Sequence, residues 1–354
     1  MTLPAHRAFQ DRFAVSRPTK DVDHVLKDPR ALARERMDQV LRDLRKLGKR
    51  SGGDPVHAAR RRFKEIRAIV RLVRGNLGER MYWRQCRLLQ RAERPLSALR
   101  DATILIKSLD AMIRLSRRSL KDSRLKPLRR GLLRREKRTR ARLFRRKHRV
   151  ADMIFLVESA KRGAELSSRG RCAWGVITRG LMRMYVGGRV AMRRALSTRS
   201  NAALHDWRKQ VTALRYAFEA LQCIRPEKIA MMARKARTLS TLLGDDHDLA
   251  VLKYVARRET KAHGSTDVST LFEVIDRRRA DLQERAFKIG GEVFLETRTQ
   301  ILRRLNAYWK VGRWQMASQR TLMIGPASHL QRAKSRRGEI KGSPMNIDRK
   351  VEGA

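Results

Sequence analysis

The sequence has 354 residues, of which 42% are hydrophobic and 5% aromatic, and its 85 Lys and Arg against 35 Asp and Glu give a formal charge of +50. The hydrophobic fraction suffices for a folded core and argues against wholesale disorder, and the scarcity of strand formers favours an all-α fold. Because a globule this basic repels itself, the charge favours an anionic partner, namely nucleic acid, an anionic membrane surface or a polymeric phosphate.

The chain is expected to contain two helical bundles between two tails. Residues 1–28 lack periodicity and are expected to be a flexible tail. Residues 29–166 predict a first bundle, with helices near 30–48, 54–74, 79–94, 97–120, 124–148 and 150–166. Residues 167–312 predict a second bundle, with helices near 174–197, 203–223, 226–243, 246–262, 268–289 and 291–310. Residues 313–354 are expected to be a second flexible tail.

The two halves resemble each other in sequence. Val56-His57-Ala-Ala-Arg60-Arg61 corresponds to Leu204-His205-Asp-Trp-Arg208-Lys209 at an offset of 148. Leu96-Ser-Ala-Leu-Arg-Asp101 corresponds to Leu243-Gly-Asp-Asp-His-Asp248 at an offset of 147. Two matches with nearly one offset indicate a duplication, so we expect two four-helix-bundle-like antiparallel halves related by a pseudo-two-fold axis.

The helix expected over 54–74 has a basic face opposite its apolar face. At about 100° of rotation per residue, one stripe about 80° wide carries a histidine and four cations. These residues are His57, Arg60, Lys64, Arg67 and Arg71, with Arg61 beside them. Phe63, Ile66, Val70 and Val73 fall on the opposite side, which therefore is the expected core face.

The helix expected over 203–223 repeats this design in a weaker form. His205, Arg208 and Arg215 fall at the angles of His57, Arg60 and Arg67, and Lys209 matches Arg61. Thr212 stands where the first copy has Lys64, and Glu219 stands where it has Arg71. The apolar side consists of Trp207, Val211, Leu214 and Phe218.

A charged stripe is most often only a solvated helix face. Such faces usually mix signs, however, because i,i+4 pairs of opposite charge stabilise a helix and like charges destabilise it. A nearly all-positive stripe in both halves therefore favours a polyanion-binding groove. This hypothesis requires the two stripes to converge and not to be neutralised by internal carboxylates.

The sequence resembles the CHAD family, the conserved histidine α-helical domain. The resemblance lies in Val56-His57-x-x-Arg60-x-x-x-Lys64-x-x-Arg67, in Leu204-His205-Asp-Trp-Arg-Lys-x-x-x-x-Leu214-Arg215-Tyr216 and in Leu242-Leu-Gly-Asp-Asp-His-Asp248-Leu-Ala-Val-Leu252, and it covers about 29–312. It implies a basic central cavity that binds inorganic polyphosphate, often at polyphosphate granules. The binding residues that it implies are His57, Arg60, Lys64, Arg67, His205, Arg208 and Arg215, to which the stripe geometry adds Arg61 and Lys209. Thr212 departs from the family pattern, so we expect unequal contributions from the two halves.

Sequence-independent nucleic-acid binding is the main alternative. Residues 124–149 contain fourteen Lys and Arg and one acidic residue, Glu136, and such a helix could follow a phosphate backbone. Against this, the chain has no zinc-finger spacing or RNP-type aromatic run, and few aromatic residues accompany the stripes.

A metal-dependent phosphohydrolase is a weaker alternative. The doublets His205-Asp206 and His247-Asp248 would need further metal ligands. Acidic residues after Gly244 are explained by capping of a helix start or by a salt bridge to a stripe arginine, and Asp101 and Asp248 are expected to orient basic side chains. We therefore expect no catalytic residue, no metal and no cofactor.

The remaining features concern compartment and protonation. Cys86, Cys172 and Cys223 lie far apart and form no CxxC, which favours a reducing compartment. No apolar run approaches the ~20 residues of a membrane span, and the N-terminus has no signal core, so we expect a cytoplasmic protein, possibly with granule-associated protein partners. His57 and His205 are hypothesised to add positive charge below about pH 6.5.

Overall fold

The computed structural model describes residues 29–47, 54–116, 120, 122–145, 147–166, 173–263 and 268–323. All elements in these residues are helical, which confirms the predicted all-α class. The expected tail 1–28, Cys172 and residues 324–354 lie outside the described residues. The helices are α2 (Pro29–Arg45), α3 (Pro55–Leu72), α4 (Arg74–Leu77), α5 (Glu79–Leu115), α6 (Asp122–Phe144), α7 (Lys147–Leu166), α8 (Trp174–Thr198), α9 (Asn201–Leu221), the 3₁₀ turn η2 (Gln222–Ile224), α10 (Pro226–His263), α11 (Ser269–Val293) and α12 (Arg298–Met323).

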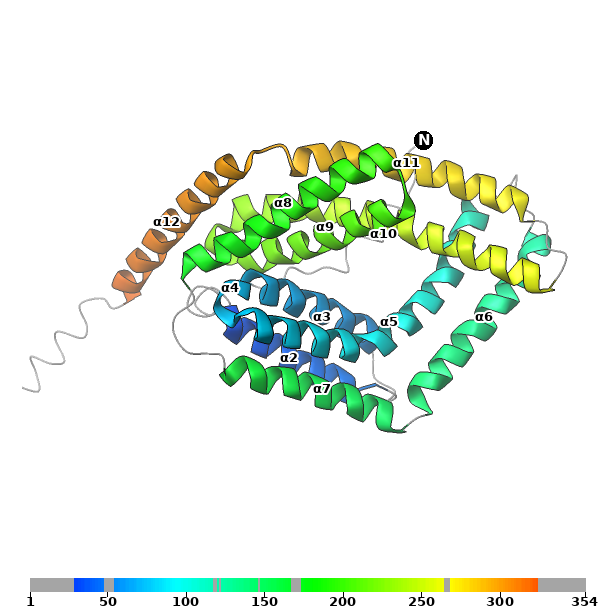
Figure 1. Cartoon of the computed structure of the whole chain (residues 1–354), viewed down its shortest axis with the longest axis horizontal. Helices are drawn as coiled ribbons and strands as arrows, with labels where there is room; N and C mark the ends of the chain where they lie inside the picture. The colour runs from blue at the N-terminus through cyan, green and yellow to red at the C-terminus, as the bar shows by residue number, and fades with distance from the viewer. Residues whose placement is uncertain are drawn as a thin grey trace, which may run out of the picture. The chain divides into compact units, whose positions relative to one another are not determined.

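The described residues up to Asn306 form one compact unit, and those from Ala307 form a second. Within the first unit, α2, α3, α5 and α7 pack together in one layer, and α8 to α11 form the other (Figure 1). The layers meet where α3 packs on α9 and α5 packs on α10. The pseudo-two-fold relation between the halves and the division of the chain at 166/167 stay predictions.

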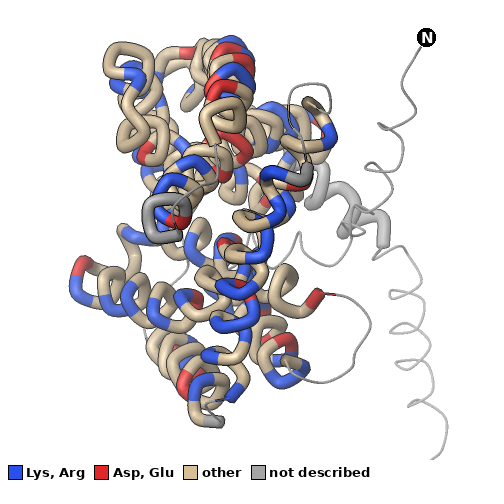
Figure 2. The backbone as a smooth tube through the Cα atoms, turned by 90° about the vertical axis from the view of Figure 1, so that its right-hand side faces the viewer, with Lys and Arg blue, Asp and Glu red and all other residues tan. Residues whose placement is uncertain are grey.

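The first layer has a continuous apolar core. It contains Met37 and Leu44 from α2, Phe63 and Ile66 from α3, Leu89 and Leu96 from α5, and Val157 from α7. All of these side chains are fully buried. Lys and Arg occur along most of the helices, with fewer Asp and Glu among them (Figure 2).

Two of the predicted helix breaks are wrong. The chain was expected to break between 94 and 97, but α5 continues through Pro95. It was also expected to break at Gly244, but α10 continues through that residue. A proline or glycine in a helix costs about 1–3 kcal/mol relative to alanine. Burial of the flanking leucines offsets this cost; they are Leu96 and Leu99 in α5, and Leu242, Leu243, Leu249 and Leu252 in α10.

The last described helix also departs from the prediction. A helix was expected over 291–310, whereas α11 continues to Val293 and α12 starts at Arg298. α12 ends at Met323, beyond the predicted end of the second bundle at 312.

Candidate anion-binding site

Helix α3 presents the first basic face. Its N-cap is Asp54, whose side chain accepts a hydrogen bond from the backbone N–H of His57 (3.0 Å), and Pro55 occupies the first helical position. Phe63 and Ile66 are buried in the first core, as the sequence predicted. Burial of this side directs the opposite side of α3, with its cations, toward the second layer.

Helix α9 presents the second basic face in the same way. Ser200 caps it by accepting a hydrogen bond from the backbone N–H of Ala203 (3.2 Å). Trp207, Val211 and Leu214 are fully buried, which confirms the predicted core face. His205 and Arg208 are half-buried on the other side.

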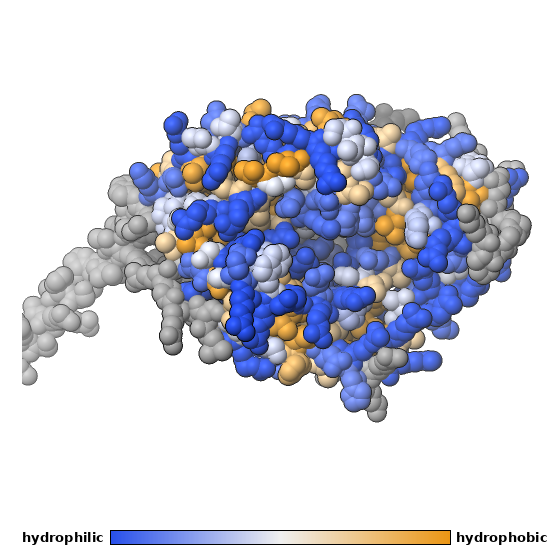
Figure 3. Space-filling model, viewed as in Figure 1, coloured by the Kyte–Doolittle hydropathy of each residue, from blue (hydrophilic) through white to orange (hydrophobic). Residues whose placement is uncertain are grey.

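The two basic faces converge. Arg60 of α3 and Arg208 of α9 are both influenced by the charges of Arg100, Asp101 and Asp248. The charge of Arg208 also acts on Lys64 across the α3–α9 contact. Figure 3 shows hydrophilic side chains over the middle of the molecular face, which is hollowed between the two layers.

Three side chains of this region were not among the predicted binding residues. Arg100 on α5 donates a hydrogen bond to Asp248 Oδ2 on α10 (3.3 Å). The ring of His247 on α10 stacks on that of His205, with centroids 4.9 Å apart. Glu93 on α5 contacts two arginines of α3, described below. We call the seven basic or histidine residues that meet here the central basic cluster: His57, Arg60, Lys64, Arg100, His205, Arg208 and His247.

Several nitrogen atoms of the cluster are buried without a hydrogen-bond acceptor among the described residues. They are Nε and Nη1 of Arg60, Nε of Arg208 and Nδ1 of His205. The ion pairs of Arg60 with Glu93 and Asp101 are both 4.0 Å long, at the outer limit for a salt bridge. Because buried donors are normally satisfied, this arrangement indicates a site for an anion that brings its own oxygen acceptors.

The comparison with protein families decides the classification. The model of the CHAD domain matches residues 50–257, more than half of the chain. The chain belongs to the CHAD domain family. No curated protein matches it. Family membership is consistent with polyphosphate binding, and the match includes α3, α5, α9 and the His247 region of α10, which contribute the whole central basic cluster.

The surroundings of Lys64 in this CHAD domain disfavour its positive charge. Burial, and then repulsion by Arg60, lower the pKa of Lys64 to about 8. Burial also lowers the pKa values of Arg60 and Arg208. The site therefore holds cations that are poorly hydrated and mutually repulsive, and a bound polyanion would relieve both costs.

In the free protein, the pKa values of both predicted histidines are lowered from the ordinary value. Desolvation, and then the charges of Arg208 and Lys209, lower the pKa of His205 to about 4. The pKa of His57 is also lowered, first by partial desolvation and then by Arg100, against the opposing charge of Asp54. At mildly acidic pH His205 therefore stays neutral in the free protein, against the hypothesis of added charge below about pH 6.5. The cationic surroundings also disfavour the imidazolium form of His57.

The outer parts of the basic faces are paired with carboxylates. Glu93 Oε2 accepts a hydrogen bond from Arg67 Nη1 (2.9 Å). In the second copy, Glu219 Oε1 accepts one from Arg215 Nε (2.9 Å). Arg61 pairs with Glu65 at 2.9 Å and Lys209 pairs with Asp206 at 3.3 Å. The expectation of nearly unneutralised stripes therefore holds only for the inner turns, which carry His57, Arg60 and Lys64 in α3 and His205 and Arg208 in α9. The carboxylates of the outer turns come partly from α5, which the stripe geometry could not show.

The acidic residues after Gly244 have other roles than capping. Asp246 lies inside α10, is buried, and accepts hydrogen bonds from Arg279 Nε and Gln283 Nε2, both 2.9 Å long. Asp248 binds Arg100, and Asp101 lies near Arg60, so both contact cluster cations as expected. Among the described residues, no three His, Cys, Asp or Glu side chains are grouped as a metal would require.

None of the described helices is long and apolar enough to traverse a lipid bilayer.

Proposed function

We propose that this CHAD domain binds inorganic polyphosphate without catalysis, through the central basic cluster. The convergence of the inner turns of α3 and α9, with buried donors of Arg60 and Arg208 that have no described acceptor, is the observation that supports the proposal most directly. Phosphate oxygens would accept these hydrogen bonds, and guanidinium groups bind phosphate in a bidentate manner.

Internal carboxylates weaken this proposal less than their number suggests. Glu93 is shared between Arg67 and Arg60, and only the contact with Arg67 has hydrogen-bond geometry. Lys64 forms no salt bridge shorter than 4.0 Å with a described residue, and its lowered pKa indicates that repulsion and burial exceed any compensation by Glu93. The inner turns therefore retain cationic donors for a ligand.

A linear polymer fits these features better than a single phosphate ion. Several cations on facing helices can each bind a different unit of one chain, and the second unit then binds at high effective concentration. Affinity should thus rise with chain length and fall steeply with salt, by analogy with counterion release from nucleic acids.

The first test is a competition between long-chain polyphosphate and duplex DNA for the full-length protein at physiological salt. Polyphosphate should displace the DNA at a lower concentration of phosphate units. A clear preference for DNA would contradict the proposal and favour the nucleic-acid alternative.

The second test locates the site. Replacement of Arg60, Arg67, Arg208 and Arg215 by Ala should weaken polyphosphate binding far more than removal of four exposed basic residues within 124–149, namely Lys126, Arg130, Lys137 and Arg142. The comparison holds the change in net charge constant. Equal losses would mean that the overall charge of the protein, and not the central basic cluster, binds the polymer.

Sequence-independent nucleic-acid binding is the second candidate, and helix α6 favours it. Arg134, Arg135, Lys137 and Arg138 are all exposed on this helix, where they could follow a phosphate backbone. A DNA affinity that depends on α6 and not on the central basic cluster would support this candidate.

The proposal of non-catalytic binding has its own test. Release of phosphate from polyphosphate and from nucleotides should not exceed background when Mg²⁺ or Mn²⁺ is added. Phosphate release that is abolished in His247→Ala would instead support a metal-dependent phosphohydrolase, because His247 belongs to one of the two His-Asp doublets.

We further propose that the protein is cytoplasmic and associates with polyphosphate granules, by itself or with granule proteins. A fluorescently tagged protein should co-localise with granules, and the quadruple arginine variant should be diffuse. An unchanged distribution of that variant would show that another region directs localisation.

A further inference from the structure

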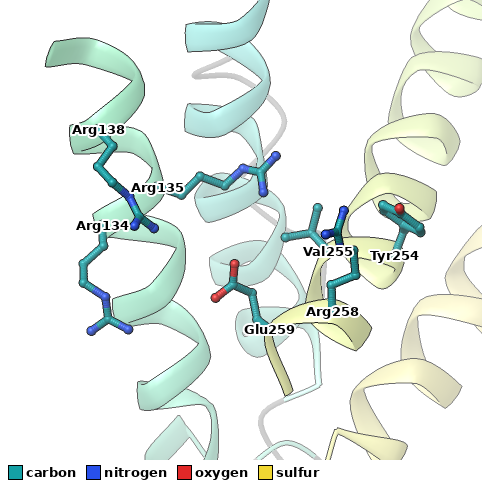
Figure 4. Close-up of a pocket in the computed structure, with 7 residues that line it drawn as sticks. All are labelled: Arg134, Arg135, Arg138, Tyr254, Val255, Arg258 and Glu259. Carbon is teal, nitrogen blue, oxygen red and sulfur yellow. The ribbon is translucent and has the colours of Figure 1, made fainter. Parts of the chain in front are cut away.

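A second cluster of arginines lies where α6 meets α10, outside the central basic cluster. The cavity has a volume of ≈ 330 Å³ and is lined by Arg134, Arg135, Arg138, Tyr254, Val255, Arg258 and Glu259. Figure 4 shows the arginines of α6 on one side and the residues of α10 on the other, with Glu259 between them. Four arginines against one carboxylate make the lining cationic.

Contacts of α6 with α5 and α10 lie beside the cavity. Arg129 Nε donates a hydrogen bond to Asp110 Oδ1 on α5 (2.8 Å), which fixes α6 against the first layer. Two residues further along α6, Gly131 is buried, and a Cβ at this position would lie 3.1 Å from Glu259 Oε2. The missing side chain therefore lets α10 approach α6 just below the arginines.

The cavity is connected to the central basic cluster along α10. At about 100° and 1.5 Å per residue, Tyr254 and Arg258 lie within about 20° of His247 on the α10 surface, and Arg258 lies about 16 Å from it along the helix. The face of α10 that carries His247 thus continues to the lining of the cavity.

Helix α5 provides a second connection. Arg100 of α5 contacts Asp248 of α10. Ten residues after Arg100, Asp110 of α5 contacts α6, and eleven residues after Asp248, Glu259 of α10 also lies against α6. The two helices therefore run side by side in one direction from the central basic cluster to α6. Lys107 is exposed and lies within about 20° of Arg100 around the α5 axis, which places another cation on this path.

We propose that the α6–α10 cavity is a second subsite for the same polyphosphate chain that occupies the central basic cluster. The inference rests on the proposed function. It adds a minimum length for tight-binding polyphosphate, because only a polymer long enough to span both sites gains affinity from both. The four guanidinium groups are opposite in charge to polyphosphate and can donate charge-assisted hydrogen bonds to its oxygens. A single-stranded nucleic acid fits less well, because Tyr254 is the one aromatic residue of the lining and lies beyond Arg258 as seen from α6 (Figure 4).

The test compares short and long chains on two triple variants of the full-length protein. In one, Arg134, Arg135 and Arg138 are replaced by Ala. In the matched control, Lys126, Arg130 and Lys137 are replaced by Ala; these three are exposed residues of α6 outside the cavity lining. Both variants lose three positive charges, and circular dichroism should show that both keep the helical content of the wild type.

Tripolyphosphate should bind the wild type and both variants with the same affinity within about twofold, since it can occupy the central basic cluster alone. Long-chain polyphosphate should bind the cavity variant roughly tenfold more weakly than the wild type, and the control variant should lose much less. The increase in affinity from tripolyphosphate to long-chain polyphosphate should therefore be smaller than in the wild type only for the cavity variant.

Three outcomes would overturn the inference. Equal losses in the two variants would mean that α6 contributes only overall charge. A loss confined to single-stranded DNA, with long-chain polyphosphate unaffected, would assign the cavity to nucleic acid. If the cavity variant retains the full affinity of the wild type for both chain lengths, the cavity is no subsite, while polyphosphate binding by the central basic cluster stands. A wild type that binds no polyphosphate at all would instead contradict the proposed function itself.

Discussion

Helices α3 and α9 have the same design but differ in how much positive charge they keep free. In α3, the inner turn carries His57, Arg60 and Lys64, whereas in α9 Thr212 takes the place of the lysine and bonds with Ser240 (Oγ1–Oγ 3.3 Å). The outer arginine of each helix is held by a glutamate. Both helices thus have a crowded inner turn next to a neutralised outer turn, and the inner turns differ by one cation.

This comparison suggests that an unpaired cation binds the ligand and a paired one mainly shapes the site. Arg60 and Arg208 are half-buried, and their buried nitrogen atoms Nε and Nη1 of Arg60 and Nε of Arg208 have no hydrogen-bond acceptor among the described residues. Arg67 and Arg215 already donate to carboxylates at 2.9 Å and would have to exchange that partner for phosphate. The exchange recovers little free energy, because the hydrogen bond gained replaces one lost.

The largest expected effect separates the inner turns from the outer turns. Arg60→Ala with Arg208→Ala should weaken polyphosphate binding by about 100-fold or more, since each charge-assisted hydrogen bond contributes about 1.5–3 kcal/mol. Arg67→Ala with Arg215→Ala should weaken it by about tenfold or less. Fluorescence titration with long-chain polyphosphate at fixed salt concentration measures the affinity of each double variant.

The two double variants lose the same charge, so each serves as the control for the other. Thermal unfolding must show that both remain folded. Greater damage from the outer pair would reverse the assignment and make the paired arginines the binding residues.

The next largest effect concerns the cation that α9 lacks. Lys64→Met should weaken polyphosphate binding by roughly tenfold. The same change should stabilise the free protein by about 1 kcal/mol or more, because an apolar side chain replaces a buried, repelled charge. Chemical denaturation at pH 7 measures the free energy of unfolding.

The pH dependence of stability tests the cause. The pKa of Lys64 is about 8 in the folded protein and 10.5 in the unfolded one, so the unfolded state holds one more proton between these values. Stability should therefore rise with pH from 8 to 10.5, and Lys64→Met should lack this component. Arg61→Met, at an exposed residue paired with Glu65, is the control and should show no stabilisation.

Helical periodicity predicted the two basic helices well. Phe63, Ile66, Val211 and Leu214 are buried as expected, since a single helix must bury its apolar side whatever surrounds it. The positions of the inner cations follow from the same rotation per residue. These features depend only on local sequence, and for that reason the sequence suffices.

Features that depend on contacts between helices were not predicted. Glu93 lies 26 residues after Arg67 in the sequence, and no spacing rule connects them. Arg100 and His247 occupy matching positions in the two similar sequence segments at the offset of 147, so this similarity contained a signal for these two residues. The predicted helix break at Gly244 was wrong because the low helix propensity of glycine costs only about 1 kcal/mol, which the burial of neighbouring apolar side chains outweighs.

The next effect is a pH dependence of polyphosphate binding through His205. The pKa of His205 is about 4 in the free protein, and nearby phosphate oxygens should raise it by favouring the imidazolium form. Binding would then take up a proton, so affinity should increase as pH falls from neutral toward 4, by about fivefold. Isothermal titration calorimetry in two buffers of different ionisation enthalpy measures the proton uptake directly.

His205→Asn is the control for this effect, because the amide keeps polar contacts and does not titrate. It should flatten the pH dependence while leaving affinity at neutral pH within about threefold. A pH dependence that persists unchanged in this variant would assign the proton uptake to another group, such as His57.

The smallest effect tests whether the outer turn of α9 can be converted into a binding turn. Glu219 Oε1 accepts hydrogen bonds from Arg215 Nε (2.9 Å) and Arg237 Nη2 (2.7 Å), so Glu219→Gln removes the charge that both arginines share. Polyphosphate affinity should rise by about threefold, and stability should fall by no more than about 1 kcal/mol. Glu65→Gln, which frees the exposed Arg61 in α3, makes the matched comparison, because it removes the same charge beside an arginine of the other copy. If affinity rises equally in both variants, only net charge is responsible; if it rises in neither, the outer turns lie beyond the reach of the bound chain, and the inner turns alone define the site.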